Sequence, residues 1–512
     1  MSIATPAAPV ANRGMITISI MLATIMTALD TTIANVALPH MAGSVSASAD
    51  QITWVLTSYI IATAIMTPMT GWLAGRLGRK QVFVISIVGF TIASALCGAA
   101  QSLEQIVLFR VLQGVFGAAM GPLSQAVMLD TYPAEERGPA MAVWGMGIMV
   151  APIVGPVLGG WLTDDFSWRW VFYINLPVGA LCLLGVTTFI PNDRSEHKIP
   201  FDVMGFALLS IALAAFQLFL DRGQNNDWFQ SSEIVIEAGV AGVALILFIV
   251  HTLSVERPFL PVELLGDRNF VTATVLGLAV GLLVFSVLAL LPPMIETLLG
   301  YPVITTGLVT APRGIGSLIS MFLVGRLVGR IDTRVLIIVG LTMFALAFLG
   351  MSRFSLGMNA FAIATTGFVQ GLGTGFVFMP MTTLAFATLA PSLRADGTGV
   401  FTLVRNLGNS AGISIMQALF TRNVQVVHSR LAEAVRPDNP LAKPPYLAAP
   451  FNLDTPIGLA ALNGEVNRQA SMVSYIDVFH LMFLTTLVMI PLVLLLKKPG
   501  DQLRSEEQLL VD

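Results

Sequence analysis

The chain has 512 residues, of which 55% are hydrophobic and only 11% are charged, and this excludes water-soluble domains because too few charges are present to cover their surface. The formal net charge of -3 gives no basic excess for nucleic acid. Cys97 and Cys182 lie in apolar runs, which favours neither a disulfide framework nor a metal cluster. The composition therefore indicates an integral membrane protein.

The first apolar run, 15–37, follows a short leader at 1–14 that contains Arg13. A cleavable signal peptide is the alternative reading of this segment. The run is long enough to span a bilayer, however, and Leu38-Pro39-His40 offers no convincing small-residue cleavage site. We therefore expect a first membrane span that is retained.

Spanning a bilayer core of about 30 Å takes roughly 20 apolar helical residues. Fourteen runs of this kind follow one another: 15–37, 52–74, 81–101, 105–129, 140–162, 171–190, 202–221, 233–254, 270–292, 304–326, 335–352, 359–389, 397–420 and 476–496. Lys and Arg are concentrated in the loops on the side of the N-terminus, which the positive-inside rule assigns to the cytoplasm. An even number of spans then places both termini in the cytoplasm. The long outer segment 421–475, with its Pro-rich run at 437–445, is expected to be a loop, either functional or disordered.

An internal repeat relates the two halves of the chain. The segment 71–80 aligns with 325–334 at an offset of 254 residues, and 111–114 aligns with 368–371 at an offset of 257. Parallel six-helix halves explain this spacing. We expect an all-α membrane protein with a bundle at 15–190, a linker with two inserted helices at 191–265, a second bundle at 266–498 and a tail at 499–512.

Two motifs carry a family resemblance. Leu29-Asp30-Thr31-Thr32-Ile33-Ala34-Asn35-Val36-Ala37-Leu38-Pro39 ends the first span, and Trp168-Arg169-Trp170-Val171-Phe172-Tyr173-Ile174-Asn175-Leu176-Pro177-Val178-Gly179 opens the sixth. With these motifs the chain resembles the major facilitator superfamily, its fourteen-helix drug:proton antiporter branch and, within that branch, the EmrB-type multidrug exporters. The resemblance covers nearly the whole chain and implies the major facilitator fold.

Asp30 and Arg110 are the candidate proton-coupling pair. A carboxylate inside a membrane helix is costly and generally marks an ion or substrate pathway. Small or polar residues share its helical face, which suits a water-accessible cleft, although a position near the outer headgroups is the alternative. Counted along their helices, Asp30 and Arg110 lie at similar depths, so they can meet. The segment from Arg110 to Ala119 resembles the superfamily motif whose Arg is implicated in proton transfer.

The fifth span carries a stripe of small residues spaced four apart, which lets another helix approach closely, together with two prolines that bend a helix. The segment 151–160 resembles a motif of the superfamily's antiporters, which favours export over uptake. Close packing alone is compatible with the same residues. The motif comprises Gly147, Ala151, Pro152, Gly155, Pro156, Gly159 and Gly160.

The loop after the second span resembles the superfamily's gating loop, with Gly71, Arg76, Gly78, Arg79 and Lys80 in their usual places. Gly75 stands where the pattern normally has Asp. Asp130, at the inner end of the fourth span, is expected to pair with Arg76 or Arg79 and close an inner gate. Positive-inside topology alone is the alternative explanation of these basic residues.

We expect the chain to export amphiphilic drugs and other toxic hydrophobic compounds in exchange for protons, without a cofactor, because it has neither a Walker-type phosphate loop nor a metal-ligand spacing. The alternatives are a dedicated exporter of one native amphiphile and, against the span-five motif, an uptake symporter. The resemblance further implies the bacterial inner membrane, a periplasmic EmrA-like membrane-fusion adaptor and a TolC-type outer-membrane channel. Candidate residues of the substrate cavity are Asn35, Gln113, Arg313, Gln370 and Arg405.

Overall fold

We analysed a computed structural model of the chain. It describes residues 12–497 apart from 134–135, 193–200, 225, 257, 391–392, 437 and 440–449. Most of the expected leader 1–14, part of the linker after residue 191, most of the Pro-rich run 437–445 and the tail 499–512 lie outside the described residues. Every named element in the described part is helical.

The first half of the chain forms helices α1 to α10. Two breaks within it follow from the sequence: Thr67 and Pro68 separate α3 from α4, and Gly78, with φ of 89°, separates α4 from α5. The elements are α1 (Arg13–Ser44), α2 (Ala49–Ile52), α3 (Trp54–Met66), α4 (Met69–Leu77), α5 (Arg79–Ala99), α6 (Leu103–Gly117), α7 (Met120–Thr131), α8 (Arg137–Asp165), α9 (Trp170–Tyr173) and α10 (Asn175–Phe189).

The second half begins with a helical hairpin and continues with a further bundle. Its elements are α11 (Val203–Arg222), α12 (Ser232–Ser254), α13 (Glu263–Gly266), α14 (Arg268–Pro293), α15 (Val303–Leu327), α16 (Thr333–Met351), α17 (Ala360–Ala387), α18 (Arg394–Ala432) and α19 (Pro456–Leu492). Short turns of other helix types extend α14 at Met294–Leu298 and α19 at Val493–Leu495, and a further one, Trp228–Gln230, precedes α12.

Eleven helices of the described residues are long and apolar enough to cross a membrane. The other three predicted spans coincide with α3 and α4, with α8 and with α18, none of which belongs to the eleven. Each of the fourteen predicted runs is therefore helical. The chain is a multi-pass membrane protein, and the total of fourteen spans stays a prediction.

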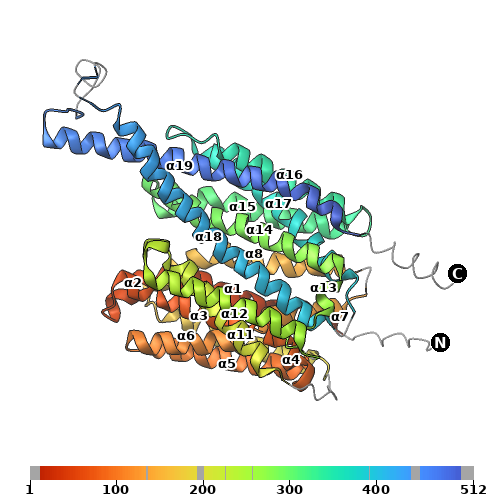
Figure 1. The fold of residues 1–512 in the computed structure, drawn as a ribbon. Helices are drawn as coiled ribbons and strands as arrows, with labels where there is room; N and C mark the ends of the chain where they lie inside the picture. The colour runs from red at the N-terminus through yellow and green to blue at the C-terminus, as the bar shows by residue number, and fades with distance from the viewer. Residues whose placement is uncertain are drawn as a thin grey trace.

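The helices form two bundles that lie side by side, as Figure 1 shows. In the first bundle α1 packs on α8 and α10, and α6 packs on α3 and α5; in the second, α17 packs on α15 and α16, and α14 packs on α18. The bundles meet where α8 contacts α15 and where α18 contacts α4 and α7. The hairpin α11–α12 is attached through α11, which contacts α3 of one bundle and α18 of the other.

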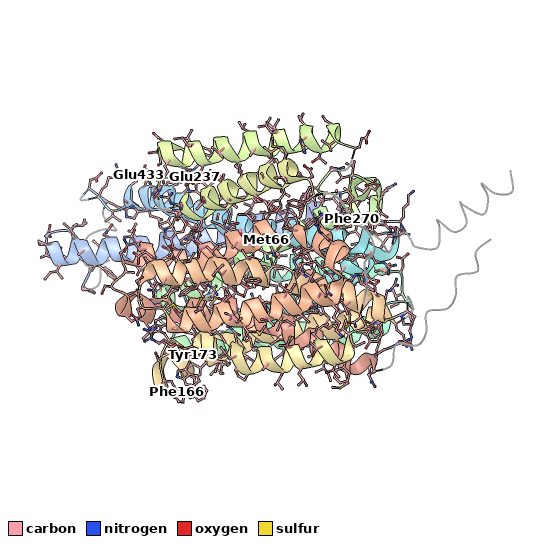
Figure 2. All side chains as sticks on the ribbon, turned by 90° about the horizontal axis from the view of Figure 1, so that it is seen from below. Met66, Phe166, Tyr173, Glu237, Phe270 and Glu433 are labelled. Carbon is pink, nitrogen blue, oxygen red and sulfur yellow. The ribbon has the colours of Figure 1, made fainter. Side chains whose placement is uncertain are left out.

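The described chain begins and ends at the same end of the molecule. Arg13, the first residue of α1, pairs with Glu136 next to the start of α8, and Lys497 is hydrogen-bonded to Asn269 at the start of α14. We call this the inner end. Figure 2 shows Phe270 toward this end and Phe166, Tyr173, Glu237 and Glu433 at the opposite one.

The outer segment 421–475 differs from the expected loop. Helix α18 continues to Ala432, and α19 already begins at Pro456, so the described part of this segment is largely helical. His428 and Asn463 join the two helices through a hydrogen bond of 3.0 Å, and Figure 1 shows both running past the other helices. The prediction was wrong because a fall in hydropathy shows where the chain becomes polar and not where the helix ends. Residues 421–432 contain no Gly or Pro that would end the helix.

Candidate functional site

Asp30 lies at the centre of a hydrogen-bond network inside the first bundle. Its Oδ2 accepts from Nη1 of Arg110 at 2.6 Å. Its Oδ1 accepts from Nε2 of Gln113 at 2.8 Å and from Nδ2 of Asn175 at 2.9 Å. Helices α1, α6 and α10 thus each contribute side chains to one carboxylate.

The partners of Asp30 are themselves fixed in place. Arg110 donates from Nε to the carbonyl oxygen of Val55 at 3.0 Å and from Nη1 to Oε1 of Gln113 at 2.7 Å. Its guanidinium lies over the ring of Tyr59, 4.1 Å from the centroid, in cation–π geometry. Asn175 also donates to Oγ of Ser94 at 3.0 Å. Amide orientations in the network are therefore set by its own donors and acceptors.

The network is closed to water. The side chains of Asp30 and Arg110 are both 0% exposed. This differs from the expected water-accessible cleft, because α3, α6 and α10 cover the carboxylate in this conformation. Every neighbour that Asp30 contacts through a hydrogen bond is a donor, so the network fits the ionised carboxylate, which only accepts.

Sequence reasoning paired Asp30 with Arg110 but assigned Gln113 to the substrate cavity, whereas the structure places it in this network. It missed Asn175, Ser94 and Tyr59 as members of the network. Asn175 belongs to the motif that opens the sixth predicted span, and an amide amid so many apolar residues was the available signal. Asn35 lies outside the network: it is exposed, and no hydrogen bond joins it to Asp30 within the described part of the chain.

The small-residue stripe of α8 faces α1. A Cβ atom on Gly147 would lie 2.9 Å from Met21, one on Gly155 would overlap the side chain of Thr32, and one on Gly159 would lie 3.3 Å from the backbone of Ile33. Ala151, between them, is fully buried, and its carbonyl oxygen accepts from Thr32 at 3.3 Å. The stripe therefore holds α8 against the helix that carries Asp30. Gly160 lies off this face, with nothing within 4 Å, and the side chains of Pro152 and Pro156 lie outside the described residues.

Gly155→Ala is expected to destabilise the protein, because the new methyl group would lie 2.8 Å from the branched Cβ of Thr32 and force α8 from α1. Overpacking of this kind costs about 1–3 kcal/mol. The matched control is Gly160→Ala, five residues further along α8 in open space. Thermal unfolding in detergent should show a lower Tm for the first variant only; equal Tm values would contradict the packing assignment.

A second cluster of charges lies at the inner end. Asp130, near the end of α7, forms ion pairs with Arg79 at the start of α5 and, at 3.0 Å, with Arg394 at the start of α18. We call these three residues the inner clamp. Because Arg394 belongs to the second bundle, the clamp joins the two bundles across their inner ends.

Other residues of the predicted gating loop have contacts outside the inner clamp. Arg76 is exposed and lies over the ring of Trp72 at 5.1 Å, so the expected pairing of Asp130 occurs with Arg79 and not with Arg76. A Cβ atom on Gly71 would overlap the carboxylate of Asp396, in the first turn of α18. Asp396 precedes the predicted span 397–420, and burial raises the pKa of its carboxyl to about 6. The family pattern has an acid at the position of Gly75. In this chain an acid, Asp396, lies instead on α18, the helix that packs against this loop.

The remaining cavity candidates lie in the second bundle. Arg313 on α15 and Arg405 on α18 are both half-buried, whereas Gln370 on α17 is fully buried. No ion pair joins either arginine to an acid among the described residues. The structure therefore does not bring these three residues to the Asp30 network.

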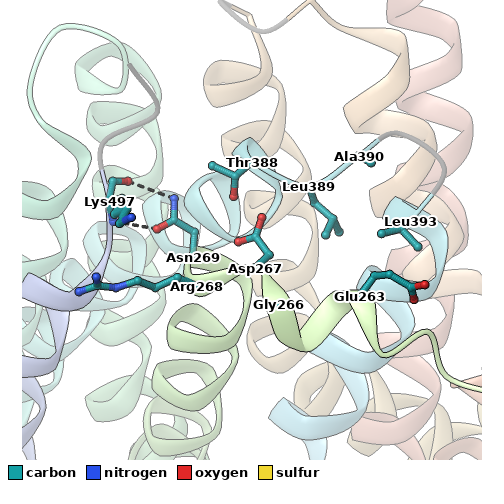
Figure 3. A pocket seen from close by; sticks show the side chains of 10 residues that line it. All are labelled: Glu263, Gly266, Asp267, Arg268, Asn269, Thr388, Leu389, Ala390, Leu393 and Lys497. Atoms are coloured by element: carbon teal, nitrogen blue, oxygen red, sulfur yellow. Dashed lines mark hydrogen bonds between the residues drawn. The ribbon is translucent and has the colours of Figure 1, made fainter. Parts of the chain in front are cut away.

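A hollow of ≈ 370 Å³ opens at the inner end of the second bundle (Figure 3). Asn269 holds Lys497, the last described residue, because its amide accepts from the backbone nitrogen of Lys497 at 2.7 Å and donates to its carbonyl oxygen at 3.0 Å. Asp267 caps α14 by accepting from the backbone of Phe270. The hollow is lined by these helix ends and lies apart from Asp30.

Comparison with known proteins identifies the family to which this architecture belongs. Residues 20–413 match the family model of the Major Facilitator Superfamily. The chain belongs to this superfamily. It is a transporter of the EmrB type: the multidrug export protein EmrB of Escherichia coli is 38% identical over 434 residues, which cover 84% of this chain and 85% of the relative. The fatty acid resistance protein FarB of Neisseria gonorrhoeae is 34% identical over 487 residues, or 94% of this chain and 96% of the relative.

Solved structures support the fold of this transporter. The human organic anion transporter MFSD10 has a TM-score of 0.59 at 14% identity, covering 92% of this chain and 99% of that one. The proton:xylose symporter XylE has a TM-score of 0.58 at 15% identity, covering 93% and 95%. Both likenesses concern the arrangement of helices alone. Among the described residues, no group of His, Cys, Asp and Glu is placed to hold a metal ion.

Proposed function

We propose that this transporter exports amphiphilic drugs and other toxic hydrophobic compounds across the bacterial inner membrane in exchange for protons, by alternating access between its two bundles. In this proposal fourteen helices span the membrane, with bundles at 15–190 and 266–498, inserted helices within 191–265 and both termini in the cytoplasm. The observation that carries proton coupling is the surrounding of Asp30 by donors alone.

The chemistry of that network supplies the coupling step. A protonated carboxyl must donate its own hydrogen, yet Arg110, Gln113 and Asn175 offer hydrogens at each contact point. Binding a proton therefore removes at least one of these hydrogen bonds and frees Arg110 from its counter-charge. Since the partners come from α6 and α10, the helices of the first bundle rearrange, and this biases the two access states.

The names of the relatives support the substrate class: multidrug export for EmrB and fatty acid resistance for FarB. A dedicated exporter of one native amphiphile, such as a fatty acid, siderophore or antibiotic, is the second candidate, and the likeness to FarB favours it. The helical extension of α18 and α19 beyond the other helices offers a contact for a periplasmic EmrA-like adaptor, which would connect to a TolC-type outer-membrane channel.

Transport in proteoliposomes with an imposed pH gradient tests the proposal. With a panel of lipophilic cations, uncouplers and fatty acids, we expect substrate to move against the direction of proton flow and the gradient to collapse faster when substrate is present. Collapse of the gradient by an ionophore should stop accumulation. Substrate movement in the same direction as protons would instead establish symport and overturn the proposal.

A further inference from the structure

The second bundle holds a cation, Arg313, that forms an ion pair with no acid in the described part of the chain. From residue 297 to residue 395 the only acid in the sequence is Asp332, which caps the start of α16 at the inner end. Arg313 lies ten residues into α15, about 15 Å from its outer start and thus near the middle of a core about 30 Å thick. A guanidinium at this depth needs partners, and no hydrogen bond or ion pair joins it to the described residues.

The internal repeat shows what Arg313 corresponds to. Arg313 follows Tyr59 by 254 residues, the same offset that relates Gly325 to Gly71. The packing agrees with this alignment. A Cβ on Gly114 would lie 2.6 Å from the carbonyl oxygen of Tyr59, and a Cβ on Gly371 would overlap the carbonyl oxygen of Arg313. The helix pair α15–α17 thus repeats the crossing of α3 and α6, which builds the Asp30 network.

The second bundle keeps the cation and the amide of that network but lacks its acid. At the offset of 257, Arg110 corresponds to Gly367, where a Cβ would lie 3.7 Å from the Cβ of Arg313. In the second bundle the guanidinium therefore belongs to a residue of α15 instead of α17. The side chain that carries it begins next to Gly367, the position that corresponds to Arg110. Gln113 corresponds to Gln370. Asp30 corresponds to Val284 or Val287 at the two offsets, so the carboxylate has no counterpart.

Gln370 supplies an independent sign that a partner is missing. Its side chain is 0% exposed, yet neither Oε1 nor Nε2 has a hydrogen-bond partner among the residues that the structure describes. Its counterpart Gln113 makes hydrogen bonds through both atoms. A buried polar group without partners costs about 1–3 kcal/mol, which a polar ligand can recover. Like Arg313, Gln370 lies ten residues from the outer end of its helix, so both groups share one depth.

We propose that Arg313 and Gln370 form a receptor for the anionic head group of the transported compound, so that the preferred substrates are lipophilic organic acids. The ligand's carboxylate would take the place that Asp30 occupies in the first bundle, accepting from the guanidinium and the amide. Arg405, on α18, adds a second positive charge to the same bundle and attracts the same class of ligand. This inference deepens the proposed export function and rests on it.

Equilibrium binding to the full-length protein in lipid nanodiscs tests the receptor with three probes of equal chain length: decanoate, decanol and decyltrimethylammonium. We expect Arg313→Gln to weaken decanoate binding by roughly tenfold or more, the equivalent of about 1.4 kcal/mol, and to leave decanol binding unchanged. The matched control is Arg326→Gln, which removes the same charge from an exposed position at the inner end of α15 and should change neither. Equal loss of decanoate and decanol binding, or no loss, overturns the proposal.

Gln370→Glu provides a second variant, so the test does not depend on whether the protein folds with Arg313→Gln. It supplies an acid inside the protein, so decanoate binding should be lost while decyltrimethylammonium binding is retained or strengthened. Unchanged decanoate binding contradicts the assignment. None of these measurements uses a pH gradient. A transporter that exports cations against protons but does not prefer decanoate would refute the receptor alone, whereas decanoate selectivity without gradient-driven export would refute the proposed function alone.

Discussion

Asp30→Asn is expected to abolish gradient-driven export. An asparagine has the shape of the protonated acid, and its amide hydrogens would face the donors of Arg110, Gln113 and Asn175. The side chain can neither release a proton nor neutralise the buried guanidinium. Removal of one partner of a buried ion pair costs about 3–5 kcal/mol, so Tm should fall as well. The transporter would be held in its proton-bound arrangement.

Two readouts separate lost coupling from lost folding. Proteoliposomes carrying a pH-sensitive dye report substrate-dependent proton movement, which should vanish, while substrate binding to the detergent-solubilised variant should persist. Asp164→Asn is the control, because that acid lies near the outer end of α8 with its side chain 71% exposed. Full proton-dependent transport by Asp30→Asn would remove Asp30 from the mechanism.

Asp130→Asn is expected to open the inner end. The variant loses the charge that holds Arg79 and Arg394, and with it the ion pair that crosses from one bundle to the other. The Asp130 side chain is 29% exposed and that of Arg394 11%, so we assign the pair about 1–2 kcal/mol, between surface and buried values. The ratio of closed to open molecules should then fall by about 5–30-fold.

Spin labels at positions 76 and 330, both exposed at the inner ends of the two bundles, measure this change by pulsed electron paramagnetic resonance in a variant without cysteine. The distance distribution should shift toward longer values. Glu136→Gln is the control, because Glu136 pairs with Arg13 inside one bundle and does not cross to the other. An unchanged distribution in Asp130→Asn would refute the clamp.

The sequence predicted the elements that depend on local pattern. Apolar runs located every long helix, because a bilayer requires about 20 such residues in succession. Depth along the helix placed Asp30 and Arg110 at a level where they meet, and the ion pair at 2.6 Å agrees with that count. The repeat offsets related Gln113 to Gln370, and these positions occupy corresponding helices in the structure.

Features that depend on tertiary contact were not predictable in this way. Asn35 shares a helix with Asp30 but points elsewhere, and only the packing of α10 on α1 brings Asn175 to the carboxylate. The water-accessible cleft was inferred from small residues on α1, yet α3, α6 and α10 pack around the carboxylate and cover it. The early start of α19 was missed as well, although Thr455, whose side chain accepts from Gly458, and Pro456 together mark that start.

Helix α18 runs without interruption for 39 residues, about 58 Å, which is roughly twice the thickness of the hydrocarbon core. One end carries Arg394 of the inner clamp, and the other stands clear of the bundle beside α19. A helix of this kind behaves as a stiff rod. In the proposed transport cycle, opening of the clamp would tilt the inner end of α18 and move its distal tip in the opposite direction. A protein bound at that tip would then respond to which side of the membrane is accessible.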